Sequence, residues 1–288
     1  MFTTLLLLLA FGQQDSIFHN PESIAYAAQN DTYYVGNYGN GTIVKTHNEE
    51  YEVFVSGYES FMGIKIHQQT LYVAEDRKTL PDRVIGFSLA TGQKLFEITM
   101  DQSLQFNDLE FGPAGQLWVS DRVAHKVYQI NPKTLQYTLI TNRINTPNGL
   151  YFDAKNNRLL ICNTIEKSSI YTYDLTTKTL DVLIKTDYAN FDGITGDKNG
   201  AIYVSSWSKD WHKSVLLKLE NNRIEHLLEN TWGMADISYL AHNNTLAIAC
   251  FLQIKSIFIH FKTPTHEKQI NHATRTFDRR ITPCATGQ

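Results

Sequence analysis

Cysteine and proline are scarce in this chain of 288 residues. Its 3 Cys include no Cys-x-x-Cys pair, so the sequence offers neither a disulfide framework nor a zinc or redox site of that kind. Only 7 Pro and 16 Gly argue against a fibrous or low-complexity chain. Cys162 and Cys250 lie within apolar runs, where a buried thiol is the expected state.

Positive charge is not in excess either, because 26 Lys and Arg stand against 29 Asp and Glu, a formal net charge of −3. Binding to nucleic acid or to an anionic membrane needs a concentrated basic surface, which this composition does not provide. No Gly-x-Ser-x-Gly, His-Glu-x-x-His or Gly-x-x-x-x-Gly-Lys motif occurs, which excludes several large enzyme classes. We expect a monomer whose partner is a small-molecule substrate.

The N-terminal residues differ from the rest of the chain. Leu5 to Phe11 form a run of seven apolar residues, followed by the polar residues Gln13, Gln14 and Asp15. Such a run is too short to cross a hydrocarbon core of about 30 Å, but it suits the apolar region of a secretory signal. We therefore expect a signal peptide over residues 1–12 and a secreted or periplasmic protein that does not contact the membrane after cleavage. The alternative is an apolar N-terminus with no targeting role.

One sequence unit recurs six times. Each unit opens with a short polar or small pair, followed by apolar residues at alternate positions, which is the pattern of a half-buried strand. The opening residues lie 40 to 45 positions apart and are Glu22, Met62, Asn107, Asn148, Asp192 and Ala235. A second strand follows 11 to 13 residues later, centred on Val35, Val73, Val119, Ile161, Val204 and Ile248. Turn residues such as Asn156-Asn157 separate the two strands.

This even spacing, without any sustained helical period, predicts an all-β fold. We expect a six-bladed β-propeller of four-stranded antiparallel blades over residues 13–262, followed by a C-terminal tail over residues 263–288. The last unit shows three strands, the third being Ser256–Phe261. We expect Ser16–Asn20 to add its fourth strand and so to close the ring.

The six opening residues are expected to meet at one mouth of the central channel, because the innermost strands of a propeller line that channel. Four of them carry side-chain oxygens: Glu22, Asn107, Asn148 and Asp192. Carboxylate and amide oxygens without His or Cys suit a divalent cation, with calcium first and magnesium, manganese or zinc as alternatives. The competing interpretation is structural, since Asn and Asp commonly begin strands by hydrogen-bonding to the local backbone.

The opening motifs resemble those of the gluconolactonase, senescence-marker-protein and paraoxonase-like six-bladed propellers, over about residues 16–262. The motifs that carry the resemblance are Asn20-Pro21-Glu22, Phe106-Asn107-Asp108, Pro147-Asn148-Gly149-Leu150 and Phe191-Asp192-Gly193-Ile194. The resemblance implies that the four oxygen-bearing residues hold a cation and that Asp192 is the catalytic base. Asp108 and Asp236, second in their openings, are candidates for orienting the ligands or water, or else for capping the strand-entry turn.

One position departs from the family pattern. Sugar-lactone members carry an Arg just before the Phe-Asn-Asp motif, and this chain has Gln105 there. Gluconolactone is therefore doubtful as the substrate. Loops expected on the same face supply further candidate substrate-binding residues, namely Arg122, Trp207 and His212, although a loop histidine is more often simply exposed.

These features support two hypotheses. The first is an exported, metal-dependent hydrolase of lactones or related esters, in which a carboxylate base removes a proton from a metal-activated water molecule. The second is a non-catalytic, metal-stabilised propeller that binds a ligand or protein partner through its top-face loops.

Overall fold

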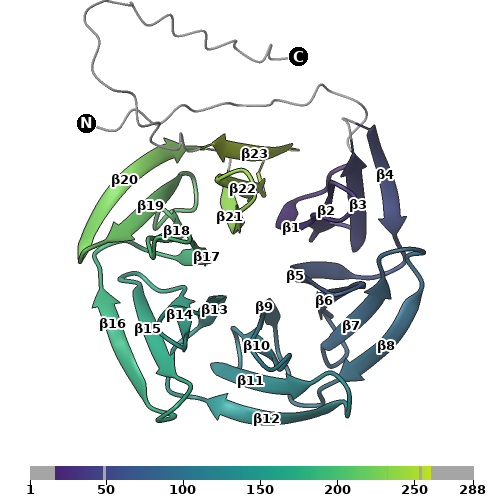
Figure 1. The fold of residues 1–288 in the computed structure, drawn as a ribbon, viewed down its shortest axis with the longest axis horizontal. Coiled ribbons are helices and arrows are strands. Elements are labelled where there is room, and N and C mark those ends of the chain that lie inside the picture. The colour runs from purple at the N-terminus through teal and green to yellow at the C-terminus, as the bar shows by residue number, and fades with distance from the viewer. Residues whose placement is uncertain (1–16, 48–49, 232, 253–254, 261–288) are drawn as a thin grey trace, which may run out of the picture.

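The computed structural model describes residues 17–47, 50–231, 233–252 and 255–260. These residues form strands and turns but no helix, and hence no helix that could cross a membrane. The strands make six antiparallel sheets set around a central axis as the blades of a propeller (Figure 1). The all-β propeller predicted from the sequence is therefore confirmed. The expected signal peptide and tail lie outside the described residues.

In each blade the strands follow one another in chain order from the centre to the rim (Figure 1). Blade 1 contains β1 (Pro21–Ala27), β2 (Thr32–Asn37), β3 (Thr42–His47) and β4 (Glu50–Val55). Blade 2 contains β5 (Ser60–His67), β6 (Thr70–Asp76), β7 (Arg83–Ser88) and β8 (Lys94–Thr99). Blade 3 contains β9 (Phe106–Phe111), β10 (Leu117–Asp121), β11 (Lys126–Asn131) and β12 (Gln136–Thr141).

Blade 4 contains β13 (Pro147–Asp153), β14 (Arg158–Asn163), β15 (Ser169–Asp174) and β16 (Leu180–Lys185). Blade 5 contains β17 (Phe191–Gly196), β18 (Ile202–Trp207), β19 (Ser214–Glu220) and β20 (Arg223–Asn230). Blade 6 contains β21 (Met234–Leu240), β22 (Thr245–Cys250) and β23 (Lys255–His260). Five blades thus have four strands, and in the described part of the chain the sixth has three.

The repeat read from the sequence corresponds closely to these blades. Every innermost strand begins one or two residues before the expected opening residue, and every expected second-strand centre lies within the second strand of its blade. Each innermost strand contacts the next one, and β21 contacts β1, so the ring is closed.

The apolar core lies between the blades. Six clusters of buried side chains occur, and each joins two consecutive blades. Between blades 1 and 2, for example, Tyr34 and Ile43 pack with Ile64 and Val73, all at most 1% exposed. Because every blade has a neighbour on each side, both faces of its sheet are buried. This explains why a second strand such as β14 contains a continuous apolar run, with five of its six residues buried.

The ring closes in a different way from the one expected. Residues 17–20 form no strand, so the prediction that Ser16–Asn20 completes the last blade is wrong for these residues. Asn20 has a φ of 50°, which an extended strand does not allow. Phe18 instead packs with Ile24, Leu240 and neighbouring residues between blades 6 and 1. The Asn20 amide Nδ2 donates to the carbonyl oxygen of Phe251 at 3.0 Å. The segment therefore links the two blades through its side chains.

Candidate functional site

A β-bulge opens every innermost strand. In blade 1, Pro21 pairs with Asn37 and Ser23 with Gly36, so Glu22 is an extra residue on its strand. In the other five blades, two opening residues face one residue of the second strand. A bulge disrupts the pairing and redirects side chains. The bulged residues are therefore free to turn towards the channel at the same level in all blades.

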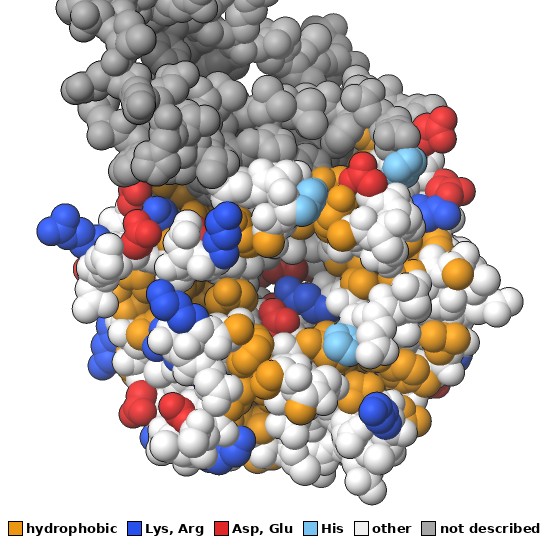
Figure 2. All heavy atoms as spheres, in the orientation of Figure 1, with side chains coloured by type: hydrophobic (Ala, Val, Ile, Leu, Met, Phe, Trp, Pro, Cys, Tyr) orange, Lys and Arg blue, Asp and Glu red, His pale blue; other side chains and the backbone are white. Residues whose placement is uncertain are grey.

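The bulges bring the four predicted oxygen-bearing residues together. Glu22, Asn107, Asn148 and Asp192, here called the mouth set, line one cavity with a volume of about 10 Å³. The other residues that line it are Gly63, Asp108, Gly149, Gly193 and Asp236. A space of this size accommodates about one water molecule or one monatomic ion. In the space-filling view, acidic and basic side chains meet at the central opening of the ring (Figure 2).

Two members of the mouth set are fixed by hydrogen bonds from blades 4 and 5. The Trp207 indole Nε1 donates to Asp192 Oδ2 at 2.9 Å, which holds the carboxylate in one orientation. The Asn148 amide Nδ2 donates to Thr164 Oγ1 at 2.8 Å, and that hydroxyl donates to the carbonyl oxygen of Phe191 at 2.8 Å. With its amide nitrogen held in this way, Asn148 keeps its Oδ1 atom available as an acceptor.

Burial makes the carboxylates of the mouth set hard to ionise without a cation. Burial raises the pKa of Glu22 well above its usual range, and the charges of Asp192 and Asp236 raise it further. Burial also raises the pKa of Asp192 to about 6, although the hydrogen bond from Trp207 opposes this change. A cation in the cavity would favour the ionised forms of both groups.

The residues present fit a hard divalent cation. In the part of the chain that the structure describes, no three His, Cys, Asp or Glu side chains could hold a metal by themselves. Two amide oxygens therefore have to complete the set with the two carboxylates, and such oxygens are typical calcium ligands. One further carboxylate oxygen of this cavity lacks a hydrogen-bond donor in the described part of the chain. Asp236 Oδ2 is buried and has no hydrogen-bond partner among the described residues.

Asp108 connects the positions of two mouth residues. It follows Asn107 on β9, and its Oδ2 atom accepts a hydrogen bond of 2.7 Å from the backbone N–H of Leu150 on β13, two residues after Asn148. Its Oδ1 atom accepts from the N–H of Leu109, also at 2.7 Å. Asp108 thus fixes blade 3 relative to blade 4 next to the mouth set. Both contacts fit the two roles considered from the sequence, ligand orientation and backbone capping.

Glycine at the second opening position lets three pairs of blades approach closely. A Cβ atom on Gly149 would lie 2.4 Å from the carbonyl oxygen of Asp192, and one on Gly193 would lie 2.7 Å from Cα of Asp236. A Cβ on Gly63 would lie 2.7 Å from the carbonyl oxygen of Asn107. Backbone atoms cannot yield at such distances, so the cavity keeps its size only while these positions carry no side chain.

Gln105 takes part in a chain of polar contacts beside the cavity. Its Nε2 atom donates to Asp76 Oδ2 at 3.2 Å, and its Oε1 atom accepts from Arg122 Nε at 2.7 Å. The charge of Arg122 acts on Glu22 and Asp192, which places the guanidinium near the mouth set. Arg122 forms no ion pair with any described carboxylate, and its terminal nitrogens donate to no described group. The Arg122 guanidinium is therefore held in place by Gln105, and its terminal nitrogens remain available as hydrogen-bond donors.

The two remaining predicted residues lie in different surroundings. Trp207 is only 5% exposed, and its indole nitrogen is committed to Asp192. The neighbouring Trp211 packs against it, with ring centroids 5.5 Å apart and the ring planes tilted by 50°, and is 45% exposed. His212 is exposed in the turn after β18, where its N–H donates to Asp210, and it does not line the cavity.

Two charged residues of the channel were missed from the sequence. Lys65 on β5 and Glu110 on β9 occupy the same repeat position, three residues after Met62 and Asn107. Lys65 Nζ lies 3.9 Å from Asp108 Oδ1, and its charge also acts on Glu110. A single charged residue within an alternating apolar strand was the available signal, and it occurs at this position in two neighbouring blades.

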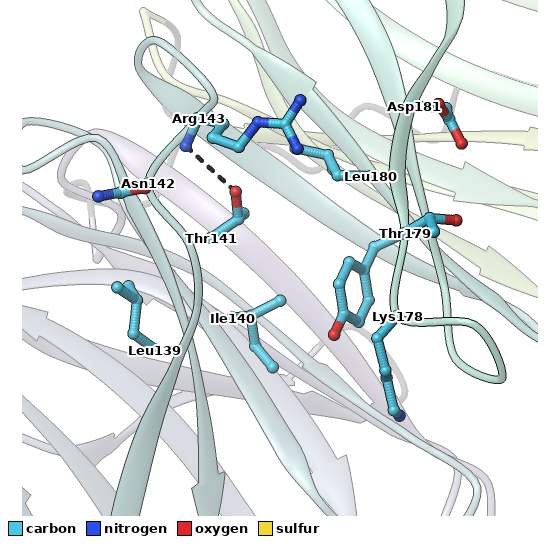
Figure 3. A pocket seen from close by; sticks show the side chains of 10 residues that line it. Leu139, Ile140, Thr141, Asn142, Arg143, Lys178, Thr179, Leu180 and Asp181 are labelled. Atoms are coloured by element: carbon cyan, nitrogen blue, oxygen red, sulfur yellow. Dashed lines mark hydrogen bonds between the residues drawn. The ribbon is translucent and has the colours of Figure 1, made fainter.

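A larger cavity, of about 520 Å³, lies away from the channel at the outer rim between β12 and β16 (Figure 3). Leu139, Ile140, Thr141 and Arg143 line one side, and residues 178–181 line the other. It contains none of the predicted site residues. Its side chains offer no cluster of carboxylates or other catalytic groups, so we take the channel mouth as the functional site.

Comparison with known proteins identifies a family. The sequence model of the SMP-30/gluconolactonase/LRE-like region matches residues 20–224. A comparison with curated protein sequences finds no significant match.

Similar solved structures share the fold. They include a gluconolactonase from Xanthomonas campestris, at 14% identity and a TM-score of 0.70, with 86% of this chain and 88% of that chain covered. A luciferin-regenerating enzyme is 13% identical, with a TM-score of 0.65 and coverage of 90% and 94%. A chain of a nidogen/laminin complex is 12% identical, with a TM-score of 0.62 and coverage of 80% and 93%. At these identities the structural matches show the fold alone.

Proposed function

Since the chain belongs to the SMP-30/gluconolactonase/LRE-like family, we propose that it is an exported, divalent-cation-dependent hydrolase of lactones or related esters. The observation that carries the proposal is the cavity of about 10 Å³ lined by Glu22, Asn107, Asn148 and Asp192. These residues come from four different blades. The gluconolactonase from Xanthomonas campestris shares the fold and supports the reaction class.

The four residues of the mouth set would hold the cation, with calcium as the first candidate. A divalent cation held there would polarise a substrate carbonyl and lower the pKa of a nearby water molecule. Asp192 would take the proton of that water, because its carboxylate lies in the same cavity and is ionised when a cation is present. Trp207 keeps the carboxylate in the orientation that this transfer needs.

The reaction consumes one water molecule for each lactone opened. The water oxygen bonds to the carbonyl carbon, and its proton passes to Asp192. The bond between the carbonyl carbon and the ring oxygen then breaks, and the ring oxygen takes the proton back from Asp192. The product is a hydroxy acid, and Asp192 returns to its ionised form.

Arg122 is the residue best placed to recognise an oxygen atom of the substrate outside the reacting group. Its guanidinium is fixed through Nε by Gln105, while its terminal nitrogens have no described acceptor. An Arg in this state can donate two parallel hydrogen bonds to a carbonyl or carboxylate of the substrate. We propose that it replaces the Arg that sugar-lactone enzymes carry at the position of Gln105.

A panel of lactones tests the proposal. The chain is freed of metal with a chelator, and hydrolysis is followed by acid release with and without added calcium. We expect turnover that depends on calcium and disappears in Asp192→Ala, with the fold intact by circular dichroism. Turnover that is unaffected by both the chelator and Asp192→Ala would contradict the proposed mechanism.

The second candidate is a non-catalytic propeller that uses the cation for stability and the top-face loops for binding a partner. It is favoured by the exposed Trp211, which packs against Trp207, and by the occurrence of this fold in a nidogen/laminin complex. Thermal stabilisation by calcium without hydrolysis of any lactone in the panel would support this candidate.

A further inference from the structure

A second group of charged side chains adjoins the mouth set, and two of its members also line the cavity of the mouth set. Lys65, Asp108, Glu110 and Asp236, here called the channel cluster, come from β5, β9 and β21. They stand one or three residues after the openings of their strands, and a strand advances about 3.3 Å per residue. The charge of Lys65 acts on all three carboxylates. Three acidic groups and one basic group therefore share a buried space.

Asp236 has an oxygen atom without a partner. The side chain is only 6% exposed. Oδ1 accepts a hydrogen bond of 2.8 Å from the N–H of Ile237, whereas Oδ2 meets no donor in the described ranges. The equivalent Asp108 uses both oxygens, one of them on the next blade. A buried carboxylate oxygen left unpaired is costly, and a positive group close to Asp236 reduces that cost.

Lys65 is the positive group that the sequence provides. Its side chain is 17% exposed, and Nζ lies 3.9 Å from Asp108 Oδ1, which is an ion-pair distance without a direct hydrogen bond. Burial alone would lower the pKa of Lys65, but Asp108, Asp236 and Glu110 raise it above its usual range. The side chain is therefore an ammonium cation and not a neutral amine that could serve as a nucleophile.

We infer that the Lys65 ammonium is a tethered cation that takes the place of a dissolved ion among Asp108, Glu110 and Asp236. An exchangeable ion is then confined to the mouth set. Removing the ammonium group of Lys65 vacates its place beside Asp108, outside the space that the first ion fills. Asp108 and Asp236, which also line the cavity of the mouth set, then become oxygen ligands for a second divalent cation at that place. The inference rests on the proposed function in one respect: it assumes that the ion bound by the wild type lies at the mouth set.

Lys65→Met tests the inference because it keeps the apolar stem and removes the charge. The chain is stripped with a chelator and titrated with calcium in a calorimeter, and its melting temperature is measured with and without calcium. We expect the variant to bind one more calcium ion per chain than the wild type. We also expect a lower melting temperature than that of the wild type in chelator and a larger rise with calcium.

Three further variants serve as controls. Lys65→Arg keeps the charge and should keep the wild-type number of ions. Lys45→Met removes a Lys whose partner, Glu52, lies on the surface at 2.6 Å, and it should leave the number unchanged. In the double variant Lys65→Met, Asp236→Asn the additional ion should be lost, because a ligand has been removed.

An equal number of bound ions in Lys65→Met and the wild type overturns the inference. So does a Lys65→Met chain that fails to fold even with calcium, because a free ion then cannot replace the ammonium. A variant that folds only with calcium supports it. The proposed function has a separate failure: it is contradicted if the wild type binds no ion at its mouth set. The inference about Lys65 is tested by the difference in the number of bound ions between Lys65→Met and the wild type.

Discussion

The mouth set and the channel cluster are two acidic regions of one channel that obtain their positive charge differently. The mouth set has two carboxylates and two amides, and no described Lys or Arg forms an ion pair with them. The channel cluster contains Lys65, 3.9 Å from Asp108. On the proposed function, the mouth set takes its positive charge from an ion in solution, whereas we infer that the channel cluster is compensated by Lys65 of the chain itself.

This difference indicates how a repeated sequence unit can form a single site for an exchangeable ion. All six blades present a bulge at the same level, but only four openings carry oxygen at the first position. At the position three residues further on, one blade carries a Lys and the next a Glu. The repeat thus supplies the same backbone six times, and single side chains decide where an ion is needed.

The largest effect is expected from removing the charge of Asp192. Asp192→Asn should abolish the rise in melting temperature that calcium causes and reduce any lactone turnover by about 10²–10⁴-fold, because both a ligand and the base are lost. Differential scanning fluorimetry with and without calcium measures the first effect. Asp187→Asn, five residues earlier and 91% exposed, is the matched control and should behave as the wild type. If calcium raised the melting temperature of Asp192→Asn as much as that of the wild type, the proposed difference between the mouth set and the channel cluster would be contradicted.

The next effect comes from the packing behind the mouth. Gly149→Ala places a Cβ atom 2.4 Å from the carbonyl oxygen of Asp192. We expect a loss of roughly 1–3 kcal/mol in the free energy of unfolding, measured with urea, together with weaker calcium binding. Gly57→Ala is the control, since nothing lies within 4 Å of its Cβ and only the φ of 90° is strained. It should leave calcium affinity unchanged, and equal calcium affinity in both variants would contradict the account.

The pH dependence sharpens the comparison further. Burial raises the pKa of Asp192 to about 6 and that of Glu110 to about 7, so both bind protons more readily in the folded than in the unfolded chain. The stability of the cation-free protein should therefore fall as the pH rises from about 4 to about 7. A cation favours ionised Asp192, so the calcium-induced rise in melting temperature should grow over this range. A rise that shrinks with increasing pH would argue against a cation at Asp192.

The smallest effect is expected at Gln105, which positions Arg122 without belonging to either region. Gln105→Leu removes one hydrogen bond to the guanidinium, and we expect KM for the best lactone to rise about 2–10-fold with kcat nearly unchanged. Calcium affinity should remain that of the wild type. A fall in kcat with constant KM would instead assign Gln105 to the reacting centre.

The repeat allowed the propeller and the mouth set to be predicted, because apolar alternation and the position of Glu22, Asn107, Asn148 and Asp192 are local features of the sequence. The bulges were not predictable, since an extra residue before an alternating strand leaves the alternation intact. Lys65 and Glu110 were visible as residues, but their meeting with Asp236 requires the closed ring. Residues 17–20 were misjudged because the positive φ of Asn20 and the burial of Phe18 depend on blade 6.

The most direct test of the central claim is a crystal structure of the chain soaked in calcium, with the ion located by its anomalous signal. The account predicts one ion, with oxygen atoms of Glu22, Asn107, Asn148 and Asp192 at about 2.3–2.6 Å from it. An empty mouth at saturating calcium, or an ion held by other residues while these four side chains point apart, would contradict it.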